Sequence, residues 1–109
     1  MKTRHVLLII QTALLVGCQT PVPAIVAKTL TYACADGRTV QAVYPDTDNA
    51  VLRFDGQTHQ LHIAVSADGA RYVGQDWQWW TTGMHEGRLA PLKSGETIAS
   101  ASGVSCIAP

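Results

Sequence analysis

The chain has 109 residues, eight basic and eight acidic side chains and three cysteines. That length allows one domain, whose hydrophobic core alone stabilises it only modestly. Nothing in this charge balance favours nucleic acid, whose binding calls for a basic patch, so no nucleic-acid partner is expected.

Residues 1–17 are predicted to be a lipoprotein signal peptide. Lys2 and Arg4 precede an apolar run over residues 6–16, which is too short to span a bilayer as a helix. A positive start, an apolar stretch and small residues are the zones of a secretory signal. Residues 15–18 read Leu-Val-Gly-Cys and resemble the bacterial lipobox, which implies cleavage before Cys18 and lipid attachment to its thiol. An ordinary secretory signal with an incidental cysteine is the alternative.

Cleavage there leaves 92 residues with six basic and eight acidic side chains, a net charge of about −2. Lipid chains on Cys18 would anchor the protein durably to a membrane. Gln19 is not the aspartate that resembles an inner-membrane retention signal, so the outer membrane, facing the periplasm, is expected. Residues 18–28 then comprise the lipidated cysteine and a proline-containing tether, and residues 29–109 the folded domain.

The two remaining cysteines, Cys34 and Cys106, form an even pair in an oxidising compartment. They lie 72 positions apart, and closing so long a loop would stabilise the fold by roughly 4 kcal/mol. Metal ligation or catalysis is the alternative, but neither cysteine has a neighbouring Cys-x-x-Cys or histidine partner. A Cys34–Cys106 disulfide is therefore predicted.

Apolar and polar residues alternate along most of the domain, as they do in half-buried strands. Asp-Gly pairs, which favour tight turns, begin at positions 36, 55 and 68. The expected strands cover residues 29–34, 39–44, 50–54, 60–65, 71–73, 77–81, 88–92 and 104–107, with Ile98 near the last. About eight short strands predict an all-β antiparallel barrel or sandwich. A disulfide between the first and last strands suits a closed barrel, where those strands are neighbours.

The aromatic run predicts one indole outside the core. Alternation places Trp77 and Trp79 on one face and Trp80 on the other, so at least one ring should face outward or into a cleft. Tryptophan is common at binding hot spots. The alternative is that all three rings cover the core and the ends of a small barrel.

No cofactor, metal or catalytic centre is expected. His59 and His62 stand three positions apart on a strand and so point to opposite faces, which opposes a shared metal, and His85 is isolated. The sequence contains no Gly-x-Ser-x-Gly elbow and no phosphate-binding loop.

Residues 65–89 resemble the signature of the membrane-bound inhibitors of c-type lysozyme. The match extends over nearly all of residues 29–107. It includes Tyr32, Cys34, the Asp-Gly turn after them, residues 40–44, Ser66, Gly69, Arg71, Tyr72, Trp80, Gly83, Glu86, Leu89 and Cys106. The resemblance implies an eight-stranded antiparallel β-barrel with one disulfide, carried by an envelope lipoprotein. It also implies that the loop 66–72 and the turn 80–83 block the muramidase cleft. The implied lysozyme-binding residues are Ser66, Asp68, Gly69, Arg71, Tyr72 and Thr82, with Thr81 beside them.

Two departures fall where the family places its inhibitory contacts. Asp68 replaces the second serine of the loop, and Thr82 replaces a lysine. An ionised aspartate only accepts hydrogen bonds, and it would be repelled by the catalytic carboxylates in a partly dry cleft. Lysozyme affinity is therefore expected to be weaker than the family pattern implies.

Two interpretations of function remain. The first is an inhibitor of c-type lysozyme, towards which a slightly acidic domain would be steered because such lysozymes are basic. The second is an envelope interaction or structural lipoprotein on the same barrel, with another target such as a different secreted hydrolase. In that case Asp68 and Thr82 would set the target. In either case Asp68 is a binding residue or serves only the turn before Gly69. Arg71 would either bridge to a partner's carboxylate or decorate an exposed strand face.

Overall fold

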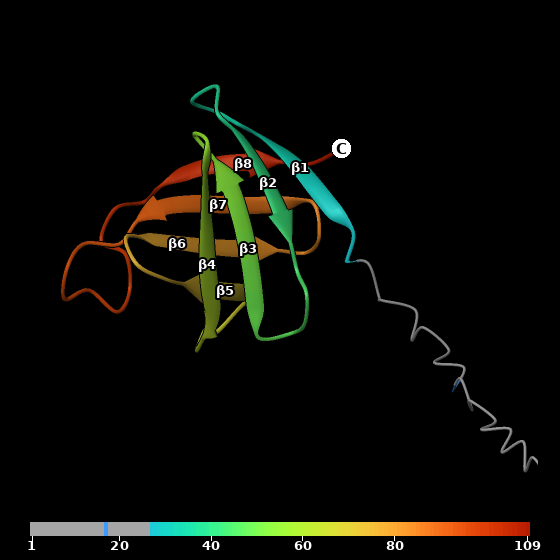
Figure 1. Ribbon diagram of the computed structural model, residues 1–109. Coiled ribbons are helices and arrows are strands. Elements are labelled where there is room, and N and C mark those ends of the chain that lie inside the picture. Colours follow the sequence, from blue (N-terminus) through green and yellow to red (C-terminus); the bar gives the residue numbers. More distant parts are fainter. Residues whose placement is uncertain (1–16, 18–26) are drawn as a thin grey trace, which may run out of the picture.

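A computed structural model describes Gly17 and residues 27–109. Residues 1–16 of the predicted signal peptide, the lipidation at Cys18 and most of the tether lie outside these residues. Eight strands form the regular structure: β1 (Thr29–Cys34), β2 (Thr39–Val43), β3 (Asn49–Phe54), β4 (Gln57–Ala64), β5 (Ala70–Val73), β6 (Trp77–Thr82), β7 (Glu86–Pro91) and β8 (Val104–Ile107) (Figure 1). Across the part of the chain described, no helix is long and apolar enough to cross a membrane.

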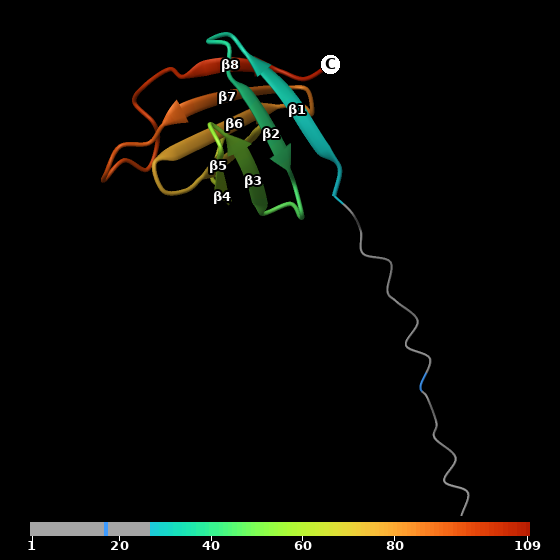
Figure 2. The same cartoon turned by 45° about the horizontal axis from the view of Figure 1, so that its top comes forward.

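The strands form a closed antiparallel barrel in sequence order (Figures 1 and 2). The last strand, β8, pairs with β1, and Cys34 lies directly opposite Cys106 in that pairing. The two cysteines form a disulfide. Closure gives every strand two neighbours, although β1 and β8 pair only at Ala33 and Cys34. The predicted all-β class, the eight-stranded barrel and the disulfide are all confirmed, and the sandwich alternative is excluded.

The barrel interior follows from the period-2 alternation, because successive side chains point to opposite faces of a strand. The largest fully buried side chains are Trp79, Tyr32, Leu52, Leu61, Leu89, Val40 and Cys106. Trp79 reaches across to β7, where a Cβ at Gly87 would collide with the indole. A residue without a side chain is therefore required opposite this ring.

A hydrogen-bonded network holds the aromatic core. The Trp79 indole N–H donates to the Tyr44 hydroxyl over 2.9 Å, and the Tyr32 hydroxyl lies 3.1 Å from that of Tyr44. Tyr32 also donates to the Met84 carbonyl at 2.9 Å. Burial raises the pKa of Tyr32, of Tyr44 and of Tyr72 above the ordinary value. The folded barrel therefore favours the neutral form of these phenols.

The sequence-based strand bounds differ from the structure at several ends: Tyr44 lies beyond β2, Val65 beyond β4 and Leu92 beyond β7. The run at 60–65 ends at Ala64, and Val65 is 92% exposed while Ile63, at the end of the barrel, is 40% exposed. Val65 leaves the strand because its carbonyl accepts hydrogen bonds from the Arg71 guanidinium instead of a neighbouring strand. Ile98 lies in no strand; it belongs to the segment 92–103 between β7 and β8.

Candidate functional site

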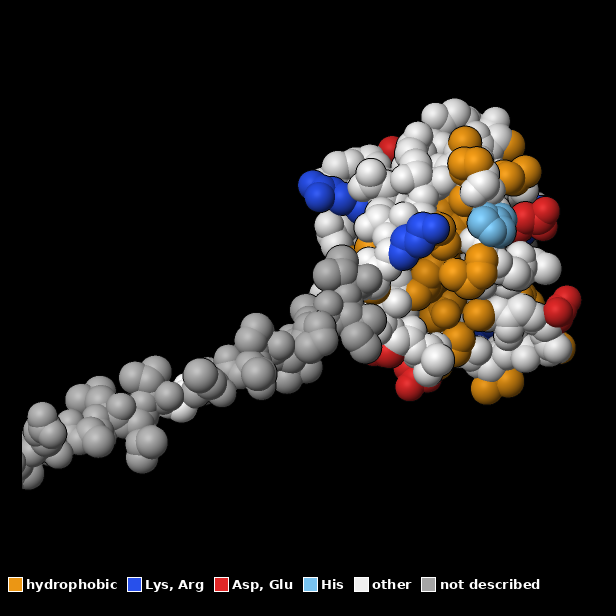
Figure 3. Space-filling view, turned by 90° about the vertical axis from the view of Figure 1, so that its right-hand side faces the viewer, with side chains coloured by type: hydrophobic (Ala, Val, Ile, Leu, Met, Phe, Trp, Pro, Cys, Tyr) orange, Lys and Arg blue, Asp and Glu red, His pale blue; other side chains and the backbone are white. Residues whose placement is uncertain are grey.

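One end of the barrel has a partly apolar surface. The start of β1 and the turn between β6 and β7 meet there around a hollow of about 290 Å³, lined by Lys28, Leu30, Tyr44, Met84 and His85. Figure 3 looks onto this side of the barrel and shows hydrophobic side chains gathered between charged ones. The predicted binding loop also approaches this end, because Asp68 and Thr82, beside the β6–β7 turn, line one groove.

The loop before β5 is fastened to β6. The Trp80 indole N–H donates to the Asp68 carbonyl at 2.8 Å, and the Ser66 hydroxyl donates to the Gly69 carbonyl at 3.2 Å. Gly69 has φ +65°, and a Cβ there would collide with the Thr81 carbonyl. Both facts require glycine at this position. The loop tip therefore stands in a fixed place beside the end of β6.

Arg71 is a buried clamp. Only 5% of it is exposed, and its Nε and Nη2 donate to the Val65 carbonyl at 3.2 and 2.8 Å. Its Nη1 donates to the Thr97 carbonyl at 2.9 Å and to Gln78 Oε1 at 3.4 Å. Gln78 Oε1 also accepts from the Ala99 N–H at 3.0 Å. Arg71 and Gln78 thus tie the binding loop and the segment 92–103 to the same two strands.

This placement corrects the expectation that Arg71 lies on an exposed face. Its cross-strand neighbour Trp80 lies on the same outer side of the sheet, with the guanidinium carbon 5.9 Å from the ring centre. The segment 92–103 contacts this side chain through the Thr97 carbonyl, and the Val65 carbonyl accepts from the other guanidinium nitrogens. A cation is tolerated there because its donors are paired with carbonyl oxygens.

Tyr72 is also buried, at 6% exposure, but on the inner side of β5. It pairs in register with Trp79 and packs against Tyr44 with ring centres 5.7 Å apart. The buried Thr81 hydroxyl donates to the Ala70 carbonyl at 3.2 Å. The predicted residues that present exposed groups are therefore Asp68, Gly69 and Thr82, with Ser66 partly covered. Arg71 and Tyr72 support them from behind.

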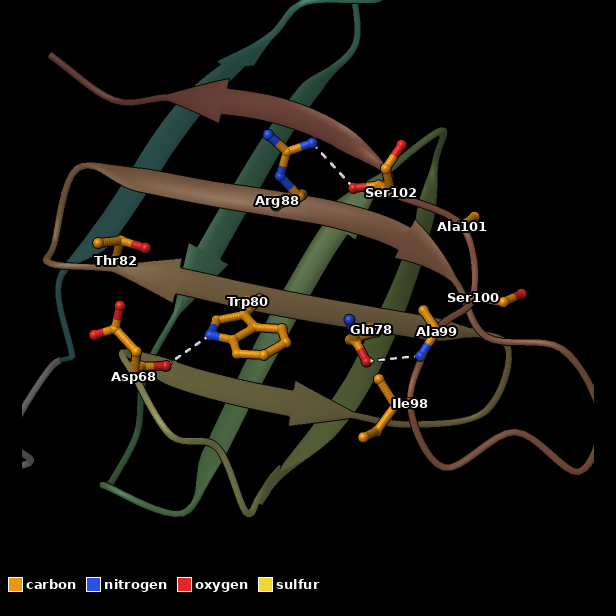
Figure 4. A pocket seen from close by; sticks show the side chains of 10 residues that line it. All are labelled: Asp68, Gln78, Trp80, Thr82, Arg88, Ile98, Ala99, Ser100, Ala101 and Ser102. Carbon is orange, nitrogen blue, oxygen red and sulfur yellow. Dashed lines mark hydrogen bonds between the residues drawn. The ribbon is translucent and has the colours of Figure 1, made fainter.

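A groove of about 450 Å³ runs from this loop along the outer side of β6. Its lining residues are Asp68, Gln78, Trp80, Thr82, Arg88, Ile98, Ala99, Ser100, Ala101 and Ser102. Figure 4 shows the Trp80 indole in the middle, with Asp68 and Thr82 at one end and the segment 98–102 at the other. Of the two interpretations of the aromatic run, the position of Trp80 supports the one in which at least one indole faces outward or into a cleft.

Sequence reasoning missed one whole wall of this groove. Arg88 is the cross-strand partner of Trp80, so strand pairing could have placed it on the same face. The segment 98–102 carries no periodicity that would have located it.

The histidines occupy separate positions. His59 stacks on Phe54 with ring centres 4.6 Å apart, and His62 Nδ1 lies 2.7 Å from Asn49 Oδ1. Within the described residues, no group of three or more His, Cys, Asp or Glu side chains could hold a metal ion.

The structure defines a class of small antiparallel β-barrels, in which a disulfide joins the first and last strands and the loop before β5 is hydrogen-bonded to β6. The family model for the membrane-bound lysozyme-inhibitor of c-type lysozyme matches residues 32–97. The chain belongs to this family.

Individual members of the family can be named. The chain is 40% identical over 77 residues to a membrane-bound lysozyme inhibitor of C-type lysozyme from Cupriavidus necator, covering 68% of this chain and 61% of that protein. It is 32% identical over 90 residues to the protein of that name from Pseudomonas aeruginosa, covering 72% and 63%. The chain thus spans less than two thirds of the length of both curated relatives.

A solved structure shares the fold. It is the crystal structure of Pseudomonas aeruginosa MliC in complex with hen egg white lysozyme, matched with a TM-score of 0.54 and 28% identity over 76% of this chain and 82% of that one.

Proposed function

We propose that this protein is an envelope-anchored inhibitor of c-type lysozyme. The observation that carries the proposal is the fixed juxtaposition of the loop tip at Asp68 and Gly69 with Thr82, on one exposed edge of the barrel. Family membership supports the same activity, as does the lysozyme complex of the Pseudomonas protein. The named relatives are inhibitors, which favours a role other than catalysis.

The proposed mechanism is occlusion of the muramidase cleft by a rigid edge. Loop 66–72 and turn 80–83 would enter the cleft together, with Ser66, Asp68, Gly69 and Thr82 forming the contact. Arg71 and Tyr72 would hold these residues in place rather than touch the enzyme, because both side chains are buried. Loops whose conformation is already fixed lose little entropy on binding.

Asp68 and Thr82 would limit the affinity. No side-chain donor is described within hydrogen-bonding distance of the Asp68 carboxylate, and it would meet the carboxylates of a lysozyme cleft. Repulsion between like charges in a dry site costs several kcal/mol or forces a carboxylate to bind a proton. Thr82 can donate a hydrogen bond but brings no positive charge. The same two residues favour the second candidate function, in which the edge binds another envelope or secreted protein with a more basic surface.

The envelope location is also part of the proposal. Lipid chains on Cys18 would hold the barrel at the outer membrane, facing the periplasm, behind the tether 18–28. This location would place the inhibitor beside the peptidoglycan that lysozymes attack. Labelling with a radioactive fatty acid tests it: Cys18→Ser should abolish the label and release the protein from membranes. Release of a labelled chain would contradict the location.

Residual lysozyme activity across a titration with the purified protein tests the inhibition. We expect weak inhibition by the unaltered chain and at least about tenfold tighter inhibition by the double variant Asp68→Ser, Thr82→Lys, because it removes a repulsion and adds an attraction. Thr39→Lys, exposed on β2, controls for added charge alone and should change nothing. Nanomolar inhibition by the unaltered chain would contradict the expectation that its affinity for lysozyme is weak. Absence of inhibition by both proteins would favour the second candidate function.

A further inference from the structure

We propose that the groove over Trp80 binds neutral pyranose saccharides. This is a ligand class separate from the protein partner proposed above, and it uses the outer wall of β6 rather than the loop tip alone. The groove combines an aromatic floor, two opposite charges and hydroxyl groups, within a volume typical of small-ligand sites.

The aromatic floor is the first part of the argument. Trp80 lies on the outer side of the barrel, is only half-buried, and is seen face-on in the groove (Figure 4). One face of a pyranose ring is made of C–H groups, and its edge carries hydroxyl groups. An indole offers a broad apolar surface of matching size with little flexibility. The indole N–H is already bonded to the Asp68 carbonyl, so the ring is held in its orientation.

The rim supplies both donors and acceptors. Arg88 on β7 uses Nη1 to donate to the Ser102 and Gly103 carbonyls at 3.0 and 3.4 Å, and its other N–H groups have no partner among the described hydrogen bonds. The Asp68 carboxylate and the Thr82 hydroxyl lie at the other side of the ring. A polyhydroxyl ligand both donates and accepts, so it can satisfy these groups together.

The charges on the two sides select against ions. An anion would be attracted by Arg88 and repelled by Asp68, and a cation would meet the reverse arrangement. A neutral ligand avoids both repulsions and can still accept from the guanidinium and donate to the carboxylate. Strong hydrogen bonds of this kind involve one charged partner.

The walls are fixed in advance of binding. Arg71 and Gln78 join the segment 92–103 to β5 and β6. One buried hydrogen-bonded cluster therefore positions both the strands and the segment that form the sides of the groove. A preformed groove avoids the entropic cost of ordering its walls around the ligand.

The experiment is a titration of the full chain with the trisaccharide of N-acetylglucosamine, in a zwitterionic detergent that has no sugar headgroup. NMR follows the indole N–H signals of the three tryptophans. We expect a saturable shift of the Trp80 signal, with the buried Trp79 signal unmoved. Trp80→Ala should weaken binding at least about tenfold and Arg88→Ala about threefold, whereas Trp80→Phe, which keeps a ring, should weaken it less than Trp80→Ala.

Two results would overturn the proposal. One is the absence of saturation up to the solubility limit of the sugar, and the other is unchanged binding by Trp80→Ala in a protein whose NMR spectrum remains folded. Thr39→Lys serves as the matched control away from the groove. No lysozyme is present in this titration, so its outcome is independent of the inhibition assay.

Discussion

The side chains on the inner and outer surfaces of β5 and β6 are shielded from solvent in different ways. On the inner surface Tyr72 and Trp79 pair in register and are buried among other apolar rings. On the outer surface Arg71 and Trp80 pair in the same way, and Arg71 is as buried as Tyr72. The inner surface is covered by the barrel itself, whereas the outer surface is covered by the loop 65–69 and the segment 92–103 through hydrogen bonds.

The difference separates the fold from the site. Apolar packing inside the barrel determines the shape and tolerates little change. Polar contacts outside determine where the binding loop and the groove wall stand. The barrel can therefore persist while residues on the outer surface change.

The largest expected loss of stability comes from a substitution on the inner surface. Trp79→Ala should lower the free energy of unfolding by about 3–5 kcal/mol, because it leaves a cavity and removes the donor to Tyr44. The matched outer change, Trp80→Ala, should cost about 1–2 kcal/mol because that ring is only half-buried. Denaturant unfolding of both variants measures the contrast. Equal losses would show that the two surfaces are energetically alike.

A smaller effect is expected from breaking the outer surface. Arg71→Met should cost about 1–3 kcal/mol, because the Val65 and Thr97 carbonyls lose their donors. It should also free the segment 92–103, which hydrogen exchange at the Ala99 amide would detect, since Gln78 loses its partner as well. Arg71→Lys keeps the charge but lacks the planar guanidinium. Its stability should lie between those of the unaltered protein and Arg71→Met. Unchanged exchange at Ala99 in Arg71→Met would contradict the clamp.

Alkaline titration reports on the inner surface alone, because all three tyrosines of the chain lie in or against the core. Burial raises their pKa values in the folded state, while the unfolded chain titrates near pH 10. Above that pH the unfolded state loses protons that the folded state keeps, so stability is full below pH 10 and falls as the pH rises. The loss should grow as the pH rises further above 10, and Tyr44, whose pKa burial raises most, should contribute the largest part.

Denaturant titrations across this range, with tyrosinate absorbance recorded in parallel, test the alkaline prediction. The absorbance should rise together with unfolding, and mass spectrometry should confirm that the disulfide stays closed. Phenolate absorbance in a protein that is still folded would argue against the protection of these groups by burial.

The same comparison explains what the sequence could predict. Alternation, the Asp-Gly turns and the cysteine pair depend on neighbouring positions or on one covalent bond. They predicted an all-β barrel or sandwich and the disulfide, but they left open which indole, if any, faces outward. The burial of Arg71 depends on Thr97, which is 26 positions away in a segment without periodicity. The groove wall at 98–102 depends on the same contact. Resemblance to a family predicted the binding residues, and the structure adds which of them are exposed and which are buried.

The smallest expected effect sharpens the contrast between two arginines on the outer surface. Arg88 is exposed, and it bonds to Ser102 and Gly103 from the rim of the groove rather than from beneath it. Exposed side chains away from buried networks usually change stability by no more than about 0.5 kcal/mol, so Arg88→Ala should lie within that range. Thermal unfolding of Arg88→Ala beside Arg71→Met would measure it. A loss as large as that of Arg71→Met would mean that the segment 92–103 depends on both guanidinium groups, and the clamp would then extend across β7 as well as β5 and β6.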